Sequence, residues 1–290
     1  MASVSPKILV FGATGSIGSE VAKALLRRKT PFRAIVHTAS KADHLKKEGA
    51  GLVEIVEADL YNLDSIAKAA EGIEVVFLMT PPGHTHQNAQ IGDTLKKAGV
   101  KRIVKLSALG CEDGEKFQWA KEHLDAENHF KSIGLPYTSL RPSAFHSNWF
   151  NYVPTVKGQN VFFNAAREAK LNHISTHDIG EVAAVALTTP GHEGKNYNIT
   201  GPDTITFAEG AELLSEVLGR KINYVGLSDE DNRKAAANFL PPQAIDGWVN
   251  MYQYFAAGGY NKHFDDLEKL TGTKGTSLKD FFTANAAAFQ

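Results

Sequence analysis

Several features that mark other classes of protein are absent from this chain of 290 residues. It contains one cysteine, Cys111, so no disulfide can form within it, as is typical of a reducing compartment. The apolar run near the N-terminus is too short for a signal peptide. No apolar stretch approaches the roughly 20 residues needed to cross a bilayer. We therefore expect a cytoplasmic protein that does not bind membranes.

An excess of charge of one sign is also absent. The 31 Lys and Arg residues almost balance the 32 Asp and Glu residues, which leaves a formal net charge of −1. Nucleic-acid-binding proteins usually carry a basic block, and this sequence has none. We therefore exclude nucleic acid as the main partner. Aromatic residues in the second half of the chain favour a small-molecule substrate, and we expect no metal site. The sequence leaves the oligomeric state open.

Short apolar runs rich in β-formers alternate with helical patterns over the first half of the chain. The six runs are residues 7–11, 32–37, 52–58, 74–79, 101–107 and 136–141. Strands that alternate with helices of about ten residues predict right-handed βαβ units and a parallel sheet. Because the runs are apolar almost throughout, we expect helices to cover both faces of this sheet.

This rhythm ends after Arg141, where a loop-rich stretch follows, and residues 229–290 have mostly helical patterns. We therefore predict an α/β protein with two parts. A Rossmann-type doubly wound parallel sheet should occupy residues 1–145, and a smaller, mostly helical C-terminal lobe that binds the substrate should occupy residues 146–290. Elements near residues 173–200 should return to the main sheet.

The strongest motif is GATGSIG, which follows the first predicted strand and precedes a helix. Glycines at this spacing permit a tight turn, close approach of the backbone to a pyrophosphate, and close packing of helix on strand. The helix N-terminus supplies N–H groups and a partial positive charge for the phosphates. The residues that we expect to bind a dinucleotide here are Gly12, Thr14, Gly15, Ser16, Ile17 and Gly18.

The end of the second strand indicates which dinucleotide binds. NAD sites usually place Asp or Glu there to accept a hydrogen bond from the ribose, but this strand ends in FRAIVHTASK without an acidic residue. Side chains suited to a 2′-phosphate stand there instead: His37, Thr38, Ser40 and Lys41. The sequence therefore predicts NADP(H), with Arg33 as a weaker candidate. The alternative is that these are only loop and helix-cap residues.

Ligands of open α/β sheets bind outside the carboxyl ends of the strands. Asp59 closes the third strand, where it either contacts the adenine or acts as a solvated cap. Thr80, Pro81 and Pro82 follow the fourth strand, and Ser107 closes the fifth. We expect these last two ends, together with the end of the sixth strand, to lie around the nicotinamide and the substrate.

The segment WAKEHLDAENHF predicts a helix over residues 119–130. Its residues Trp119, His123, Ala126 and Phe130 share one face. The ionisable His123 should therefore face inward. It is either an active-site group or a core histidine with a satisfied hydrogen bond.

Six segments together carry a family resemblance: GATGSIG, ADL after the third strand, VKLSALG, the helix with His123, GLPYTSLRP, and HISTHDIGEVAAVAL. They are similar to the NmrA-like branch of the atypical short-chain dehydrogenase/reductases. That branch contains NADPH-dependent reductases and a redox-sensing regulator. The resemblance implies a Rossmann-type fold and NADP(H) binding, and it says little about the substrate.

The resemblance also shows which catalytic group is missing. Ordinary short-chain dehydrogenases use a Tyr-x-x-x-Lys pair as proton donor, and no tyrosine here has Lys four residues later. Ser107 matches the serine that assists that tyrosine, and the family often has His or Lys at position 123 with Glu four residues on, as in Glu127. The resemblance therefore implies His123 and Ser107 as catalytic candidates, with an imidazole beside a carboxylate that donates a proton or orients the substrate. The alternative is that His123 bonds Ser107 or a backbone carbonyl and has a structural role.

Aromatic residues gather in two places in the second half. They are Phe145, His146, Trp149 and Phe150 after the sixth strand, and Trp248, Tyr252 and Phe255 at helical spacing. Such stripes are more often core than binding site, but beside a nicotinamide they would suit a flat, apolar or aromatic substrate. The predicted substrate-binding residues are Phe145, His146, Trp149, Trp248 and Tyr252.

Three functions fit these patterns. The first is an NADPH-dependent oxidoreductase that transfers hydride to a small aromatic, quinone-like, enone or iminium substrate. A conjugated acceptor of this kind takes hydride without a strong protein acid, which suits the missing tyrosine. The second is a regulatory protein that senses NADP(H) without turnover, and the third is an NADP(H)-dependent isomerase or cyclase. The aromatic residues favour a small-molecule substrate over a sensor.

Overall fold

The computed structural model describes residues 6–81, 83–114 and 116–290. They pack into two compact units that are interleaved along the chain. The first unit holds residues up to 107, 122–141 and 179–197, and the second holds residues 108–121, 142–178 and 198–290. The functional division near residue 145 that the sequence suggests stays a prediction.

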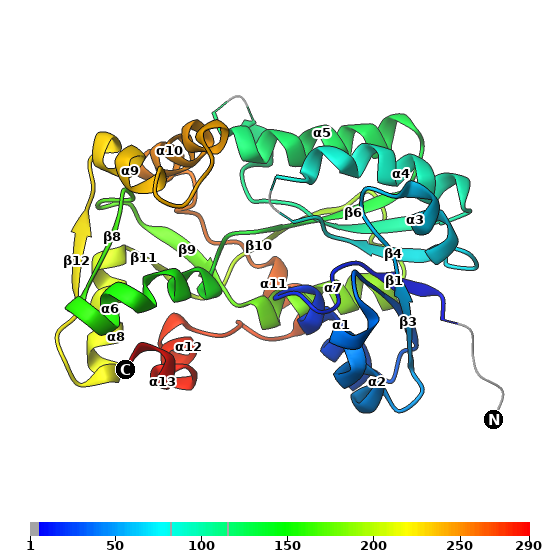
Figure 1. The fold of residues 1–290 in the computed structure, drawn as a ribbon, viewed down its shortest axis with the longest axis horizontal. Coiled ribbons are helices and arrows are strands. Elements are labelled where there is room, and N and C mark those ends of the chain that lie inside the picture. Colours follow the sequence, from blue (N-terminus) through cyan, green and yellow to red (C-terminus); the bar gives the residue numbers. More distant parts are fainter. Residues whose placement is uncertain (1–5, 82, 115) are drawn as a thin grey trace. The chain divides into compact units, whose positions relative to one another are not determined.

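A seven-stranded sheet forms the centre of the first unit, in the order β10-β6-β5-β4-β1-β2-β3 (Figure 1). Its strands are β1 (Ile8–Val10), β2 (Phe32–Val36), β3 (Val53–Glu57), β4 (Val75–Leu78), β5 (Arg102–Leu106), β6 (Tyr137–Pro142) and β10 (Asn196–Ile199). Neighbouring strands from β3 to β6 are parallel. The chain runs outward from β1 to β3 and resumes at β4 on the other side of β1, so the switch point of this doubly wound sheet lies between β1 and β4. The predicted fold class is confirmed.

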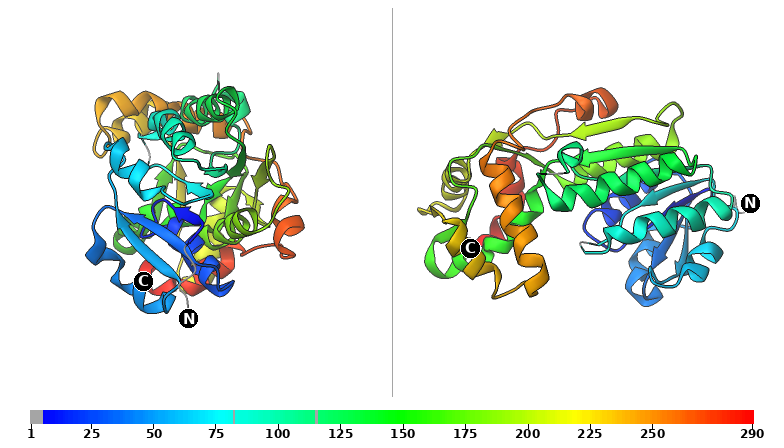
Figure 2. Two further views of the ribbon diagram at one scale, coloured as in Figure 1. Left: turned by 90° about the vertical axis from the view of Figure 1, so that its right-hand side faces the viewer. Right: turned by 90° about the horizontal axis from the view of Figure 1, so that it is seen from above.

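Helices cover both faces of this sheet (Figures 1 and 2). They are α1 (Gly18–Arg27), α2 (Asp43–Gly49), α3 (Leu63–Ala69), α4 (Asn88–Lys97), α5 (Gln118–Ser132) and α7 (Thr176–Thr188). On one face, Ile66 of α3, Ile91 of α4 and Phe130 of α5 share a buried core with strand residues. On the other face, α1 and α7 approach closely, because a Cβ on Gly180 would lie 2.7 Å from the backbone of Glu20.

The second unit contains two small sheets, in the orders β11-β9-β7 and β12-β8, and the C-terminal helices. Its elements are β7 (Ala144–Phe145), α6 (Val153–Gln159), β8 (Val161–Asn164), β9 (Leu171–Ile174), β11 (Thr204–Ile205), α8 (Phe207–Leu218), β12 (Asn223–Gly226), α9 (Asp229–Ala236), α10 (Pro242–Ala256), α11 (Asp266–Thr271), α12 (Leu278–Ala284) and α13 (Ala286–Phe289). The stretch after Arg141 that was expected to be loop-rich therefore holds short strands. They were missed because strands this short show no clear period and because β8 pairs with β12, far along the chain. Among the described residues, no helix combines the length and the hydrophobicity that crossing a membrane requires.

Candidate cofactor and active site

The glycine loop joins β1 to α1 and has a backbone that demands glycine at two positions. Gly12 has a φ of 66°, in the left-handed region that glycine adopts without strain. The N–H of Gly15 donates to the carbonyl oxygen of Gly12 at 2.8 Å. A Cβ on Gly18 would lie 2.0 Å from that same oxygen, so α1 begins in direct contact with the turn. The first and third glycines of the motif are therefore required by the fold of the loop itself.

The same loop fits a dinucleotide pyrophosphate. The first N–H groups of an α-helix have no partner within the helix, and the positive end of α1 lies at the loop. A Cβ on Gly15 would meet the Gly12 oxygen at 3.3 Å, a far milder contact than the one at the helix start. The side chains of Thr14 and Ser16 are exposed, whereas that of Ile17 is buried. Ile17 can therefore contribute only its backbone to a bound phosphate.

The loop after β2 presents exposed polar side chains. His37, Ser40 and Lys41 are exposed and Thr38 is half-buried. Sequence reasoning missed a carboxylate from the neighbouring strand: Oε1 of Glu57 accepts the N–H of Ala39 at 2.6 Å. This bond orders the loop and also places a negative charge beside the proposed 2′-phosphate site.

Arg33 does not take part in this loop. Its guanidinium donates to the carbonyl oxygens of Ala69 at 2.7 Å and Glu71 at 2.9 Å, and it pairs with Glu54 at 3.0 Å. It therefore holds the C-terminal end of α3 to the sheet. The expectation that Arg33 is a weaker phosphate ligand was wrong, because Arg33 is the second residue of β2 and its guanidinium is bound at the opposite end of the strand from the loop.

The carboxyl ends of β3 and β4 carry the other predicted cofactor residues. Asp59 is exposed, and its Oδ1 accepts the N–H of Tyr61 at 3.0 Å. Thr80 is half-buried and Pro81 exposed directly after β4, while Pro82 lies outside the described residues. Their contacts with a cofactor stay predictions.

A buried polar network lies where β5 and β6 end, and Glu127 is at its centre. The carboxylate, only 1% exposed, accepts hydrogen bonds from Ser107 Oγ at 2.6 Å, from Ser139 Oγ, and from Arg141 Nη2 at 2.6 Å. Burial would raise the pKa of Glu127, but the hydrogen bonds from Arg141, Ser107 and Ser139 outweigh it and lower the pKa. Glu127 is therefore an ionised group that ties α5 to two strands.

Lys105 and His123 form a second polar contact in the same unit. The side chain of Lys105 in β5 is fully buried, and Nζ donates to the carbonyl oxygen of Leu106 at 2.9 Å. The same Nζ lies 2.8 Å from Nδ1 of His123 on α5. Burial and the charge of Lys105 together hold the pKa of His123 well below its usual value. His123 is therefore a neutral imidazole.

The expected pairing of His123 with Glu127 was wrong. The two residues are one turn apart on α5, but they bind different strands. Nδ1 of His123 is hydrogen-bonded to Lys105 of β5. The carboxylate of Glu127 accepts a hydrogen bond from Arg141 of β6. The alternative bond from His123 to Ser107 is also not what the structure shows, because Ser107 donates to Glu127. Sequence reasoning missed the roles of Lys105, Ser139 and Arg141, although a lysine inside the apolar strand RIVKL was a usable signal.

We predict that Glu127→Gln lowers the free energy of unfolding by about 3 kcal/mol at pH 7, since loss of one partner leaves the buried Arg141 guanidinium without its counter-charge. Urea denaturation measures this loss. Glu54→Gln is the control, because its ion pair with Arg33 is partly exposed and should matter little. Equal stabilities for Glu127→Gln and the parent protein would contradict the network.

The aromatic residues of the second unit form its core. Trp149 is 1% exposed, and its ring centroid lies 5.0 to 5.2 Å from those of Phe162, Phe207 and Phe282. Trp149 therefore acts first as a packing residue, and a substrate contact from it stays a prediction.

The remaining predicted substrate residues differ in exposure. Phe145 is half-buried and Phe150 is 38% exposed, whereas His146, Tyr252 and Phe255 are buried. Trp248 is half-buried, donates from Nε1 to Asn232 at 3.0 Å, and packs on Tyr252 with ring centroids 5.2 Å apart. Phe145 and Trp248 are therefore the more accessible of the five predicted contacts.

Two buried histidines should make the protein acid-labile. His146 and His173 lie with ring centroids 6.4 Å apart, and the ring nitrogens of His146 have no hydrogen-bond partner within the described part of the chain. Burial lowers the pKa of His146 to about 3 and that of His173 to about 4. In the unfolded chain both imidazoles take up a proton near pH 6.5, whereas in the folded protein they stay neutral to a much lower pH. The free energy of unfolding therefore decreases as the pH falls from 6.5 toward 4.

We predict that, between pH 6.5 and 4, each of these two histidines lowers the free energy of unfolding by about 1.4 kcal/mol for every unit by which the pH falls. His146→Leu should reduce the total slope of the protein by about 1.4 kcal/mol per pH unit, measured by urea denaturation of the variant and the parent protein at pH 7, 6 and 5. A slope that His146→Leu does not alter would show that His146 titrates normally in the folded protein.

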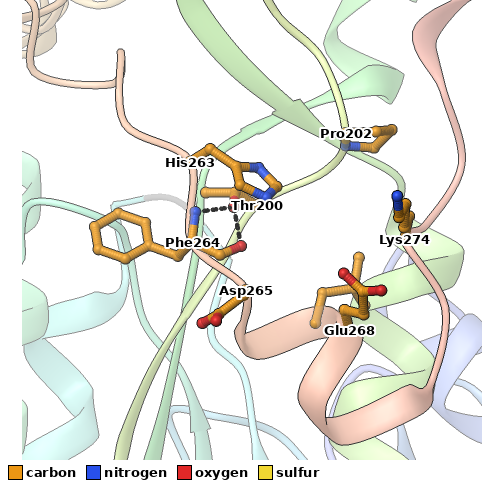
Figure 3. A pocket seen from close by; sticks show the side chains of 8 residues that line it. Thr200, Pro202, His263, Phe264, Asp265, Glu268 and Lys274 are labelled. Carbon is orange, nitrogen blue, oxygen red and sulfur yellow. Dashed lines mark hydrogen bonds between the residues drawn. The ribbon is translucent and has the colours of Figure 1, made fainter.

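The second unit also holds a cavity of about 260 Å³ (Figure 3). It is lined by Thr200, Pro202, His263, Phe264, Asp265, Leu267, Glu268 and Lys274. Most of its charged residues are exposed, and Thr200 uses its hydroxyl to bond the backbone of Phe264. It includes no predicted site residue.

Comparison with known proteins connects the glycine loop to a family. The sequence profile of the NmrA-like family matches residues 5–286. The chain belongs to the NmrA-like family. This confirms the family resemblance drawn from the motifs of the sequence.

Individual NmrA-like relatives extend over nearly the whole chain. An NAD(P)H azoreductase of Xenophilus azovorans is 32% identical over 285 residues, which is 97% of this chain and 99% of the relative. The crystal structure of Citrobacter sp. triphenylmethane reductase with NADP(H) is 28% identical, covers 96% of this chain and 99% of its own, and superposes with a TM-score of 0.84. The NADPH complex of quinone oxidoreductase QOR2 from Escherichia coli is 27% identical, covers 97% and 99%, and has a TM-score of 0.86. These relatives are reductases, and the two solved structures hold NADP(H), the cofactor that the sequence predicts for this chain.

Proposed function

We propose that this NmrA-like protein is an NADP(H)-dependent oxidoreductase that reduces a small conjugated acceptor of aromatic, quinone-like, enone or iminium type. The observation that carries the proposal is the glycine loop. Its backbone admits no side chain at Gly18, and it opens at the switch point of the sheet, where such sheets bind ligands. Ser107 and His123 lie in the same compact unit as this loop.

The relatives support the substrate class. They are named for reduction of azo compounds, quinones and triphenylmethane dyes. Each of these substrates is conjugated, so the electrons of an arriving hydride can be delocalised. This chemistry suits a chain in which no tyrosine is followed by lysine four residues later.

The residues of the chain would divide the work as follows. The loop from Gly12 to Gly18 binds the pyrophosphate, and the loop from His37 to Lys41 binds the 2′-phosphate. Asp59 contacts the adenosine, and Thr80, Pro81 and Ser107 lie at the nicotinamide. A bound NADPH supplies the hydride. Phe145, His146, Trp149, Trp248 and Tyr252 remain the proposed substrate contacts.

We predict that the protein binds NADPH more tightly than NADH and that Lys41→Ala lowers NADPH affinity about tenfold, the effect of one phosphate contact of about 1.4 kcal/mol. The reason is that Lys41 stands after β2, where no carboxylate ends the strand. Calorimetric titration of both cofactors tests this. Lys47→Ala, an exposed lysine at the end of α2, is the control.

The assignment of Lys41 to the 2′-phosphate would be contradicted if the parent protein bound NADH more tightly than NADPH. It would also be contradicted if Lys41→Ala lowered the affinities for both cofactors equally. Glu57 would then be the residue to examine, because its carboxylate already orders this loop.

The oxidoreductase proposal itself is tested by following NADPH consumption against a panel of quinones, azo dyes, enones and iminium compounds. Consumption that depends on the acceptor supports it. Tight NADPH binding without consumption by any member of the panel would instead support the regulatory interpretation.

A further inference from the structure

Lys105 is an unusual residue for its place in the fold. It lies near the carboxyl end of β5, in the middle of the parallel sheet, and its side chain is 0% exposed. A buried ammonium group is costly unless its protons are hydrogen-bonded. Two of its partners are the Leu106 carbonyl oxygen at 2.9 Å and His123 Nδ1 at 2.8 Å. An apolar residue at this position would avoid the free-energy cost of burying a charge. We therefore infer that Lys105 has a role other than packing.

The contact with His123 determines where the imidazole proton lies. An ammonium group has only donors, so Nδ1 of His123 must act as the acceptor. In a neutral imidazole the single proton is then on Nε2. His123 is half-buried, and Nε2 has no partner within the described part of the chain. Its N–H is available to a ligand.

We propose that Lys105 is a positioning residue that fixes His123 as a neutral imidazole whose Nε2–H donates a hydrogen bond to the substrate. This inference rests on the proposed reductase function. With a neutral acceptor such as a quinone or an enone, hydride would pass from C4 of bound NADPH, which becomes NADP+, to the electrophilic atom of the acceptor, and the π electrons of the acceptor would move to the far heteroatom. The Nε2–H of His123 stabilises the negative charge that develops there, as preorganised donors do. That heteroatom then takes a proton from water, and His123 ends the reaction unchanged.

The other charges around His123 agree with this role. Glu127, one turn along α5, accepts hydrogen bonds from Ser107, Ser139 and Arg141. Burial and the Lys105 charge both lower the pKa of His123, so the ring keeps the same proton through the neutral range.

Nitrogen NMR of the protein labelled at its 11 histidines tests the assignment without any substrate. The signals of His123 are identified by their loss in His123→Asn. We expect Nε2 to carry the proton, Nδ1 to be an unprotonated acceptor, and neither to titrate between pH 7 and 5. A proton on Nδ1, which would mean that Lys105 is a neutral acceptor, or protonation of His123 near pH 6.5, would overturn the inference.

Two variants of β5 separate positioning from stability. Lys105→Met keeps most of the volume and removes the donor, so both tautomers of His123 become populated and its titration moves toward pH 6.5. We expect kcat to fall by about tenfold and to become pH-dependent near pH 6.5, while NADPH affinity stays unchanged. Arg102→Met is the matched control, because Arg102 on the same strand holds the carbonyl oxygens of Ala186 and Leu187 and does not contact His123.

The outcomes separate this inference from the proposed function. Unchanged His123 signals and an unchanged kcat profile in Lys105→Met would overturn the role of Lys105. If Lys105→Met does not fold, the position of the imidazole proton of His123 in the parent protein, measured by NMR, still tests the inference. If the tautomer is as expected but no acceptor is reduced, the reductase function fails and the Lys105–His123 assignment stands.

Discussion

Gly15→Val should lower NADPH affinity by at least a hundredfold, about 2.7 kcal/mol at 25 °C, while the protein stays folded. The second glycine of such a loop allows the backbone to approach the pyrophosphate, and a β-branched side chain would occupy that space. The structure shows why folding should survive: a Cβ at Gly15 meets the Gly12 oxygen at 3.3 Å, which a small shift relieves. Calorimetric titration with NADPH, together with circular dichroism, measures both effects.

Two other glycines provide controls for this prediction. Gly18→Ala should lose stability as well as affinity, because its Cβ would lie 2.0 Å from the Gly12 oxygen. Gly158→Ala in α6 should leave NADPH affinity unchanged and should not lower stability, because its Cβ meets nothing within 4 Å and alanine is the better helix former. A folded Gly15→Val protein that binds NADPH at the parent affinity would show that the pyrophosphate does not lie at this loop.

His123→Asn should lower kcat by about a hundredfold and leave NADPH affinity and thermal stability nearly unchanged. The asparagine oxygen can take the place of Nδ1 and accept from Lys105, but nothing replaces the Nε2–H. Loss of one preorganised donor costs on the order of a hundredfold or more in kcat. Steady-state kinetics, NADPH titration and thermal melting of the variant measure the three quantities.

The complementary variant is His123→Gln, whose amide reaches the position of Nε2 but removes the Nδ1 acceptor from Lys105. It should keep more of kcat than His123→Asn and lose more thermal stability. His129→Asn on the same helix controls for helix effects, because His129 bonds Asp93 and not Lys105. Nearly normal kcat with a lowered melting temperature in His123→Asn would make His123 a structural residue.

The sheet and the glycine loop were predictable because their signals are local. Apolar runs such as KILVF and EVVFLM and the glycines at 12, 15 and 18 specify strands and a turn within a few residues of one another. The order of the strands follows from right-handed crossovers between them. The capping box of Thr206 and Glu209 at the start of α8 is another local signal, and it too is present in the structure.

The buried polar groups were not predictable in the same way. Helical spacing places His123 and Glu127 on one face of α5, but their partners lie on different strands, β5 and β6. A sequence shows no register between a helix and the strands beneath it. The role of aromatic residues could not be predicted from their spacing either. The spacing of Trp149 from its aromatic neighbours is compatible with a core residue and also with a residue that contacts substrate.

Transfer of deuterium from NADPH to an acceptor tests the central claim most directly. NADPH deuterated at the reactive C4 position is mixed with the protein and an acceptor that the consumption assay has identified, and the product is examined by mass spectrometry. We predict one deuterium in the product at the carbon that receives the hydride, and none with Gly15→Val protein under the same conditions. Product that contains no deuterium from either C4 position, or NADPH that binds and is never consumed, would contradict the account of this protein as an NADP(H)-dependent reductase.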